Sequence, residues 1–264
     1  MVDPHRVLVT AAQMRALEQT LFAAGMPPAA LMEKAALQIA QRMAELYPRD
    51  RFPRVGVLVG PGHNGGDALV VARELHLQGR TAALHQPVPS AALLPQDHAR
   101  YGEFLGLVHQ PLSALAACDL VVDGLLGLGI TRPPTDSLAA AIAQVNAWPV
   151  PKVAIDLPSG LDSDRGVPLG ETLRADRTLC LGLWKRGLWQ EAAVPYVGVL
   201  ERLDWGVPAH LVPPNAETLM NPRIAFDRPL PQSHKYQNGR LLVVAGSRRF
   251  GGAALLAVRS EERR

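Results

Sequence analysis

Several features that would assign this 264-residue sequence to a function class are scarce or missing. Its two cysteines, Cys118 and Cys180, lie in apolar stretches with neither a CxxC partner nor nearby histidines, which predicts buried thiols. No apolar run reaches the ~18 residues of a membrane span. The first residues also lack the pattern of a signal peptide. We therefore expect a cytoplasmic protein that does not bind membranes.

Blocks of charge are missing as well. The net charge is +3 at pH 7, no five basic residues follow one another, and the basic residues are not interleaved with aromatic ones. These absences argue against a nucleic-acid-binding protein. A mild excess of positive charge suits an anionic small molecule as ligand.

What the sequence does contain is the alternation of strands and helices that is typical of an α/β protein. Strand-like apolar runs are expected at 55–59, 81–86, 118–123, 152–156, 177–183 and 197–202. Helix-like segments are expected at 67–78, around 95–105 and at 136–146. This pattern predicts a Rossmann-like, three-layer α/β/α fold with a mostly parallel central sheet, whose ligand lies beyond the carboxyl ends of the strands.

Two amphipathic helices are expected before the first of these strands, at 11–24 and 28–46. They form an arm that packs either on the sheet of its own chain or on a partner chain, and we expect a homodimer.

The first domain is expected to span 1–208. The segment 209–232 is typical of a Pro-rich linker, and 233–264 contains a second strand–glycine–helix start.

The first long strand leads into a glycine-rich turn and then a helix, an arrangement that presents backbone N–H groups to a phosphate. Gly60, Gly62 and Gly65 spell G-x-G-x-x-G. A dinucleotide dehydrogenase also needs an acidic residue at the end of the second strand, and none stands at 84–87. Asp67 instead places a carboxylate at the helix entrance. No GK[ST] follows any glycine turn, which excludes a P-loop and leaves a redox enzyme as a weak alternative.

Oxygen-bearing side chains follow three of the predicted strands directly. Asn64, Asp123 and Ser159 offer one carboxylate and two neutral oxygens, a set that suits a monovalent cation better than Mg²⁺ or zinc. Each residue also has a structural alternative. Asp123 and Ser159 are also typical of caps and turns, and Asn64 tolerates a left-handed backbone before glycine.

Asp156 closes a buried strand and is a candidate for proton transfer, because a partly buried carboxylate can have a shifted pKa. The alternative is a carboxylate that accepts backbone N–H groups from the following loop. His63 and Lys185 are candidate ligand contacts, although single residues of these types are more often simply exposed. Trp184 and Trp189 either stack on a base or pack in the core or at an interface.

Together, the motifs GPGHNGGDALVVAREL, DLVVDGLLGLGITRP and VAIDLPSGLDSDRG, in this order and spacing, resemble the NAD(P)H-hydrate epimerase family, the YjeF N-terminal domain. The resemblance covers about residues 9–208 and includes MRALEQ, LMEKAA, ADRTLCLGLWKRGL and YVGVLERLDWGVP. The segment HKYQNGRLLVVAGSRRFGGAALLAVR resembles the opening of the ribokinase-like NAD(P)H-hydrate dehydratase domain, which follows the epimerase domain in bifunctional members. Only that opening is present in 233–264, so no dehydratase activity is expected of this sequence.

The resemblance implies an isomerase of metabolite repair that interconverts the R and S epimers of hydrated NADH or NADPH at C6, with potassium as cofactor. The implied potassium ligands are Asn64, Asp123 and Ser159, and our mechanistic hypothesis makes Asp156 the general acid/base. The implied substrate contacts are His63, Asn64, Gly65, Gly66, Asp67, Gly127, Leu128, Gly129, Ile130, Thr131, Arg132, Pro133 and Asp156.

The sequence departs from the family pattern at several points. His63 and Ala68 replace an Asn and a Gly of the usual Asn-Asn-Gly-Gly-Asp-Gly, and Leu128 stands where a small hydroxyl residue is usual. Lys34 and Arg186 replace the Asn of MENAG and the Pro of KPG. His63 and Lys34 either pair with a substrate phosphate or indicate a relaxed site. The competing function class is a non-catalytic nucleotide-binding or interaction module, in which the strand-end acids would be free to vary.

Overall fold

The computed structural model describes residues 4–90, 93–219, 252 and 254–256, and the structural statements below concern those residues. The chain divides into two units, residues 1–220 and 221–264. All helices and strands named below belong to the first unit. The predicted segment 233–264 lies almost wholly outside the described residues, as does more than half of the predicted linker 209–232.

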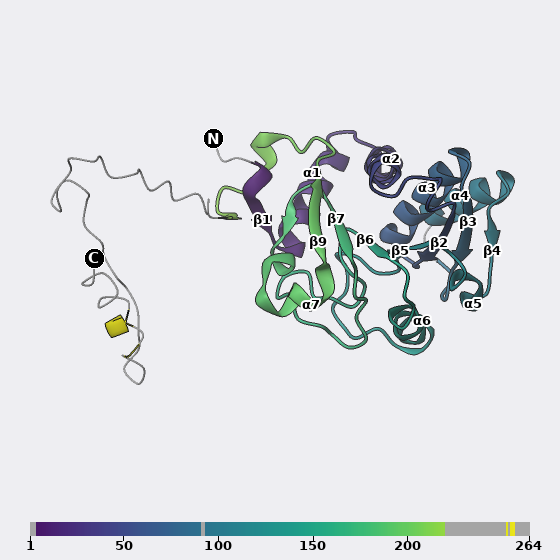
Figure 1. The fold of residues 1–264 in the computed structure, drawn as a ribbon. Helices are drawn as coiled ribbons and strands as arrows, with labels where there is room; N and C mark the ends of the chain where they lie inside the picture. Colours follow the sequence, from purple (N-terminus) through teal and green to yellow (C-terminus); the bar gives the residue numbers. More distant parts are fainter. Residues whose placement is uncertain (1–3, 91–92, 220–251, 253, 257–264) are drawn as a thin grey trace, which may run out of the picture. The chain divides into compact units, whose positions relative to one another are not determined.

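A seven-stranded sheet, parallel throughout, forms the centre of the first unit (Figure 1). Its order is β4-β3-β2-β5-β6-β7-β9. The strands are β2 (Arg54–Val59), β3 (Thr81–His85), β4 (Val108–His109), β5 (Leu120–Gly124), β6 (Lys152–Ile155), β7 (Arg177–Leu181) and β9 (Val199–Leu203). The chain runs from β2 to β3 and β4 and then returns to β5 on the other side of β2. A topological switch point therefore lies between β2 and β5, where sheets of this type bind ligands.

Helices cover both faces of the sheet, so the predicted three-layer fold is confirmed (Figure 1). One face carries α1 (Ala11–Ala23), α2 (Pro28–Leu46), α3 (His63–Leu77) and α4 (Leu93–Phe104), and the other carries α5 (Leu112–Leu115), α6 (Asp136–Asn146) and α7 (Val194–Val197). Successive side chains along a strand point to opposite faces. Val57 and Val122 therefore belong to the core under α2 and α3, whereas Leu58 and Val121 belong to the core under α5 and α6.

The two N-terminal helices pack on their own chain. Leu31, Ile39 and Met43 of α2 are buried in the core that α2 shares with α3 and the sheet. Of the two alternatives, packing on the sheet of the same chain is the one observed for α2, and the homodimer stays a prediction. None of the described helices combines the length and the apolar character that crossing a membrane requires. Cys118 and Cys180 are buried and unbonded to each other, as predicted.

A second, three-stranded sheet was not predicted from the sequence. β1 (Val7–Val9) pairs in parallel with β8 (Trp184–Lys185) and antiparallel with β10 (Glu217–Thr218), which lies within the predicted linker. Strands of two or three residues carry too few positions for a recognisable period, and their partners are distant in the sequence. This sheet ties the chain just before α1 to the segment that carries Lys185.

Helix α3 begins at His63, four residues before the predicted start at 67. The segment Asn64 to Asp67 therefore forms the beginning of the helix, and Asp67 does not stand at its entrance as expected. Glycines disfavour helix interiors, which placed the predicted start too late. Close packing explains the glycine at position 65, because a Cβ on Gly65 would lie 1.9 Å from the carbonyl oxygen of Gly60.

Candidate active site

The carboxyl ends of β2, β5 and β6 meet at a cleft of about 740 Å³, beside the switch point of the sheet. Of the substrate contacts predicted from the sequence, those on the cleft lining are His63, Asn64, Asp67, Gly127, Leu128, Gly129, Ile130, Thr131, Arg132, Pro133 and Asp156. Gly65 and Gly66 are not on the lining and are buried in the first turn of α3. The structure therefore brings most of the predicted residues to one place.

Asp156 follows β6 directly and is only 7% exposed. Its backbone is left-handed, with φ 65°, and the N–H of Leu157 donates to the C=O of Ile155 at 2.7 Å across it. Such a conformation is strained for a residue with a side chain and is often found at functional sites. The carboxylate Oδ1 accepts the backbone N–H of Leu181, at the end of β7, at 3.0 Å.

Lys185 in β8 is the charged partner of Asp156. Its Nζ lies 2.5 Å from Asp156 Oδ1 and donates to the C=O of Leu181, also at 2.5 Å. Burial alone would lower the pKa of this lysine, which is 1% exposed, but the Asp156 carboxylate outweighs burial and raises it. The donors to Asp156 thus come from β7 and β8, and Lys185 is a buried residue of the cleft lining.

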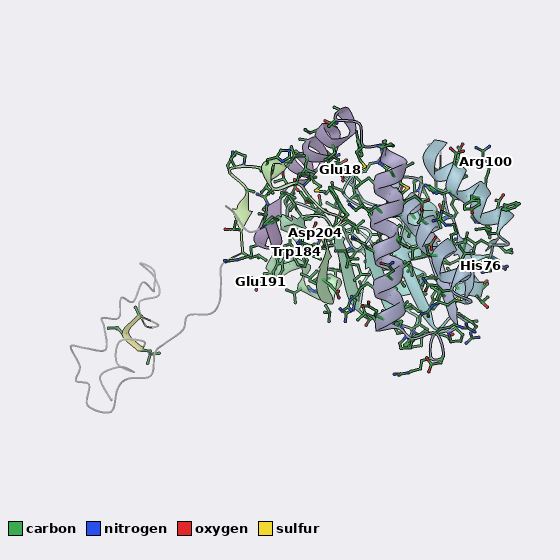
Figure 2. All side chains as sticks on the ribbon, turned by 90° about the horizontal axis from the view of Figure 1, so that it is seen from above. Glu18, His76, Arg100, Trp184, Glu191 and Asp204 are labelled. Carbon is green, nitrogen blue, oxygen red and sulfur yellow. The ribbon has the colours of Figure 1, made fainter. Side chains whose placement is uncertain are left out.

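Two further carboxyl groups, Glu18 of α1 (Figure 2) and Asp67 of α3, line the cleft with this pair. Burial raises the pKa of Asp67 well above its usual value, and the nearby Asp156 and Glu18 raise it further. Burial also raises the pKa of Glu18, while Lys185 acts in the opposite direction. Three carboxyl groups around one buried ammonium form an arrangement that is typical of proton-transfer sites.

The three predicted cation ligands come together at the loop after β5. Asp123 is fully buried and accepts the backbone N–H of Ser159 at 2.8 Å, its hydroxyl at 2.6 Å and the N–H of Leu125 at 3.1 Å. The Ser159 hydroxyl accepts the N–H of Leu126 at 2.8 Å, and Asn64 Nδ2 donates to the C=O of Leu126 at 3.2 Å. The loop backbone therefore links all three side chains.

The surroundings of Asp123 fit a monovalent cation. Burial raises the pKa of Asp123 to about 6, and the hydrogen bonds from Ser159 and Leu125 oppose that rise. Within the described residues no basic side chain pairs with this carboxylate, so a bound cation would supply the missing positive charge. No group of three or more His, Cys, Asp or Glu that could hold a metal occurs in the described part of the chain.

Other residues singled out from the sequence lie away from the cleft. Trp184 packs edge-on against Trp189, with ring centroids 5.1 Å apart, and neither lines the cleft, which leaves packing as their role. Trp205 is the tryptophan on the lining. Lys34 is absent from the lining, so of the two candidate phosphate partners only His63 reaches the cleft.

Arg15 and Glu18 are charged residues of the cleft lining that were not predicted as site residues. Both lie on α1, where the sequence shows only an amphipathic helix, and nothing in its spacing separates a cleft-facing polar residue from a solvated one. Contacts that are distant in the sequence place this helix. The Asp164 carboxylate accepts the N–H of Ala11 at 2.6 Å, at the start of α1, and β1 pairs with β8 just before it.

Comparison with known proteins adds independent information. Residues 28–187 match the family model described as YjeF-related protein N-terminus. The chain is 47% identical over 265 residues to the bifunctional NAD(P)H-hydrate repair enzyme Nnr of Synechocystis sp., covering 95% of this chain and 50% of that protein. It is 35% identical over 195 residues to the NAD(P)H-hydrate epimerase of Limosilactobacillus fermentum, covering 72% of this chain and 92% of that protein.

The chain spans about half the length of the bifunctional curated relatives that it matches. Among solved structures, the crystal structure of yeast ynu0 is similar with a TM-score of 0.64 and 20% sequence identity, covering 74% of this chain and 86% of that one. This similarity supports the fold.

Proposed function

The chain belongs to the YjeF-related N-terminal family, and from this premise we propose that it is an NAD(P)H-hydrate epimerase, an isomerase that interconverts the two C6 epimers of hydrated NADH or NADPH. The observation that carries the proposal is the buried Asp156–Lys185 pair in a cleft at the switch point of the sheet. A buried carboxylate with its own ammonium partner is suited to exchanging a proton with a bound ligand.

Substrate binding follows from the start of α3 and the loop after β5. The N–H groups of His63 and Asn64, at the start of α3, have no partner within the helix and provide a place for the diphosphate of the dinucleotide. The loop Gly127 to Pro133 lines the cleft beside them. The reacting ring would then lie toward Asp156.

The C6 hydroxyl of the hydrated ring belongs to a hemiaminal, because C6 is also bonded to the ring nitrogen. Protonated Asp156 donates its proton to this hydroxyl, the C6–O bond breaks with the nitrogen lone pair, and water departs. Water then adds to the opposite face of the iminium-like intermediate and releases a proton, so that the atoms and charges of the substrate are restored. The proton that this water releases returns Asp156 to its acid form, and Lys185, 2.5 Å from Asp156, holds the carboxyl group in position.

Potassium, when held by Asn64, Asp123 and Ser159, would supply a positive charge beside the buried carboxylate. These residues hydrogen-bond to Leu125 and Leu126, at the start of the loop that lines the cleft. Their contribution is therefore to fix that loop in position. Pairing of two chains remains part of the proposal, and sedimentation of the full chain would test it.

The test is the exchange of epimers, followed by NMR on hydrated NADPH with the full chain and an Asp156→Asn variant. Asn keeps the size and one acceptor oxygen but cannot donate an acid proton, so we expect exchange to fall to the rate without enzyme. Asp50→Asn, on an exposed residue, is the matched control and should exchange as the unaltered chain does. Near-normal exchange by Asp156→Asn would remove the assigned role, and no exchange by the folded unaltered chain would favour the non-catalytic binding module.

A further inference from the structure

Glu18 is a carboxyl group in the cleft to which neither the sequence nor the proposed mechanism gives a role. It lies on α1 (Figure 2). It is half-buried and belongs to the same cleft lining as Asp156 and Lys185. Among the described residues, no side chain or backbone group forms a hydrogen bond or ion pair with its carboxyl. A carboxyl without a hydrogen-bond or ion-pair partner in the described part of the chain, in a cleft of this kind, is available to a ligand.

Its position is fixed from two sides. A capping box of Thr10 and Gln13 starts α1, and Asp164 accepts the N–H of Ala11 at 2.6 Å. The strand before α1 pairs with β8, which places the helix next to the strand that carries Lys185. Such anchoring holds an acid–base group at a defined distance from its substrate.

The electrostatic surroundings couple Glu18 to the catalytic pair. The Lys185 ammonium attracts the Glu18 carboxylate, whereas Asp156 repels it, and burial raises the pKa of Glu18. Asp156, in contrast, has both Lys185 and the N–H of Leu181 as donors. Within the described residues Glu18 lacks such donors, and burial favours its protonated form.

Inversion at C6 needs proton transfer on both faces of the ring, because the hydroxyl leaves from one face and water adds to the other. Asp156 reaches the cleft from the end of β6 and Glu18 from α1, so they approach a ligand from different elements. We propose that Glu18 is the second acid–base residue, acting on the face of the ring opposite to Asp156.

This inference rests on the proposed epimerase function. In one direction Glu18 donates its proton to the departing hydroxyl while Asp156 accepts a proton from the water that adds. The C6–O bond on one face breaks, a C6–O bond on the other face forms, and one proton moves from Glu18 to Asp156. The opposite direction reverses these roles, and solvent restores the starting protonation between turnovers.

The test separates inversion from loss of the hydroxyl. Each purified epimer is incubated separately with the full chain in ¹⁸O-water, and mass spectrometry and NMR follow the label in each epimer, with a sample without enzyme as background. In Glu18→Gln we expect inversion to fall about 100-fold or more. With the epimer whose hydroxyl faces Asp156, incorporation of ¹⁸O into the starting epimer should continue within ~10-fold of the total incorporation by the unaltered chain, because Asp156 still removes and returns water on its own face.

Two control variants complete the test. Glu103→Gln, on an exposed residue of α4, should leave both readouts unchanged. Glu18→Asp should recover part of the inversion. Unchanged inversion in Glu18→Gln, or a parallel loss of inversion and ¹⁸O incorporation with both starting epimers, would overturn the role of Glu18. Failure of the proposed function would look different, because the unaltered chain itself would then neither invert nor label the substrate.

Discussion

Replacing Lys185 with methionine tests whether the buried ion pair organises the cleft. Lys185 is 1% exposed and lies 2.5 Å from Asp156. Methionine keeps the length and the apolar stem but removes the charge. The Asp156 carboxylate would then remain buried near Asp67 and Glu18 without a cation, so the variant should be less stable than the unaltered chain.

The expected loss can be estimated from other buried pairs. Removing one partner of a buried ion pair costs about 3–5 kcal/mol, because the other charge stays uncompensated. For a domain of this size, about 1 kcal/mol corresponds to roughly 2–4 °C in the melting temperature, so we expect a decrease of roughly 6–20 °C. The double variant Lys185→Met/Asp156→Asn, which removes both charges, should recover most of this loss.

The assay is thermal and urea unfolding of the full chain at pH 8 and pH 5. Burial raises the pKa of Glu18 and Asp67 in the folded state above their values in the unfolded chain. The stability that these two groups contribute is therefore complete at a pH below their unfolded-state pKa and is lost as the pH rises through their folded-state pKa. Loss of Lys185 strengthens this effect, and the penalty should be larger at pH 8 than at pH 5. An equal penalty at both pH values, or a double variant less stable than Lys185→Met, would refute the reasoning.

Three further predictions concern stability. Burial raises the pKa of Asp67, so the ionised carboxylate destabilises the folded state at a pH above that pKa. Asp67→Asn should therefore raise the melting temperature by about 2–4 °C at pH 8 but not at pH 4. No gain at pH 8 would contradict this prediction. Gly65→Ala places a Cβ 1.9 Å from the Gly60 carbonyl oxygen and should lower the free energy of unfolding by about 3 kcal/mol or more. Gly62→Ala is the control, because nothing lies within 4 Å of a Cβ on Gly62, and this variant should melt within about 2 °C of the unaltered chain. Added KCl should raise the melting temperature of the unaltered chain more than NaCl does, because a bound ion stabilises the folded state, and Asp123→Asn should lack the difference. The same potassium response in both proteins would remove Asp123 as a ligand.

The large sheet could be predicted from the sequence because its inner strands are buried on both faces. The runs ending at Val59 and Ile155 are apolar throughout, and the polar groups that follow them mark the ligand-binding edge. Asp156 was identified for this reason. The start of α3 was placed too late, because local propensity disfavours Gly65 and Gly66 in a helix whereas packing requires glycine at Gly65.

The second sheet and the place of Glu18 could not be predicted, and Lys185 was predicted as a candidate ligand contact without its pairing to Asp156. Lys185 and Glu18 meet at the cleft through a parallel pair of two- and three-residue strands that are far apart in the sequence. Such pairing depends on tertiary structure and leaves no periodic signal. A single carboxylate on an amphipathic helix likewise has no local pattern that separates a cleft position from a surface position.

The central claim is that this cleft exchanges the configuration at C6 of a hydrated nicotinamide dinucleotide. The most direct measurement starts from one purified epimer of hydrated NADPH and follows both epimers by NMR in the presence of potassium and catalytic amounts of the full chain. We predict rapid conversion to the same equilibrium mixture from either epimer, with the rate proportional to protein concentration. Conversion no faster than in a sample without protein, by a chain shown to be folded, would contradict the claim.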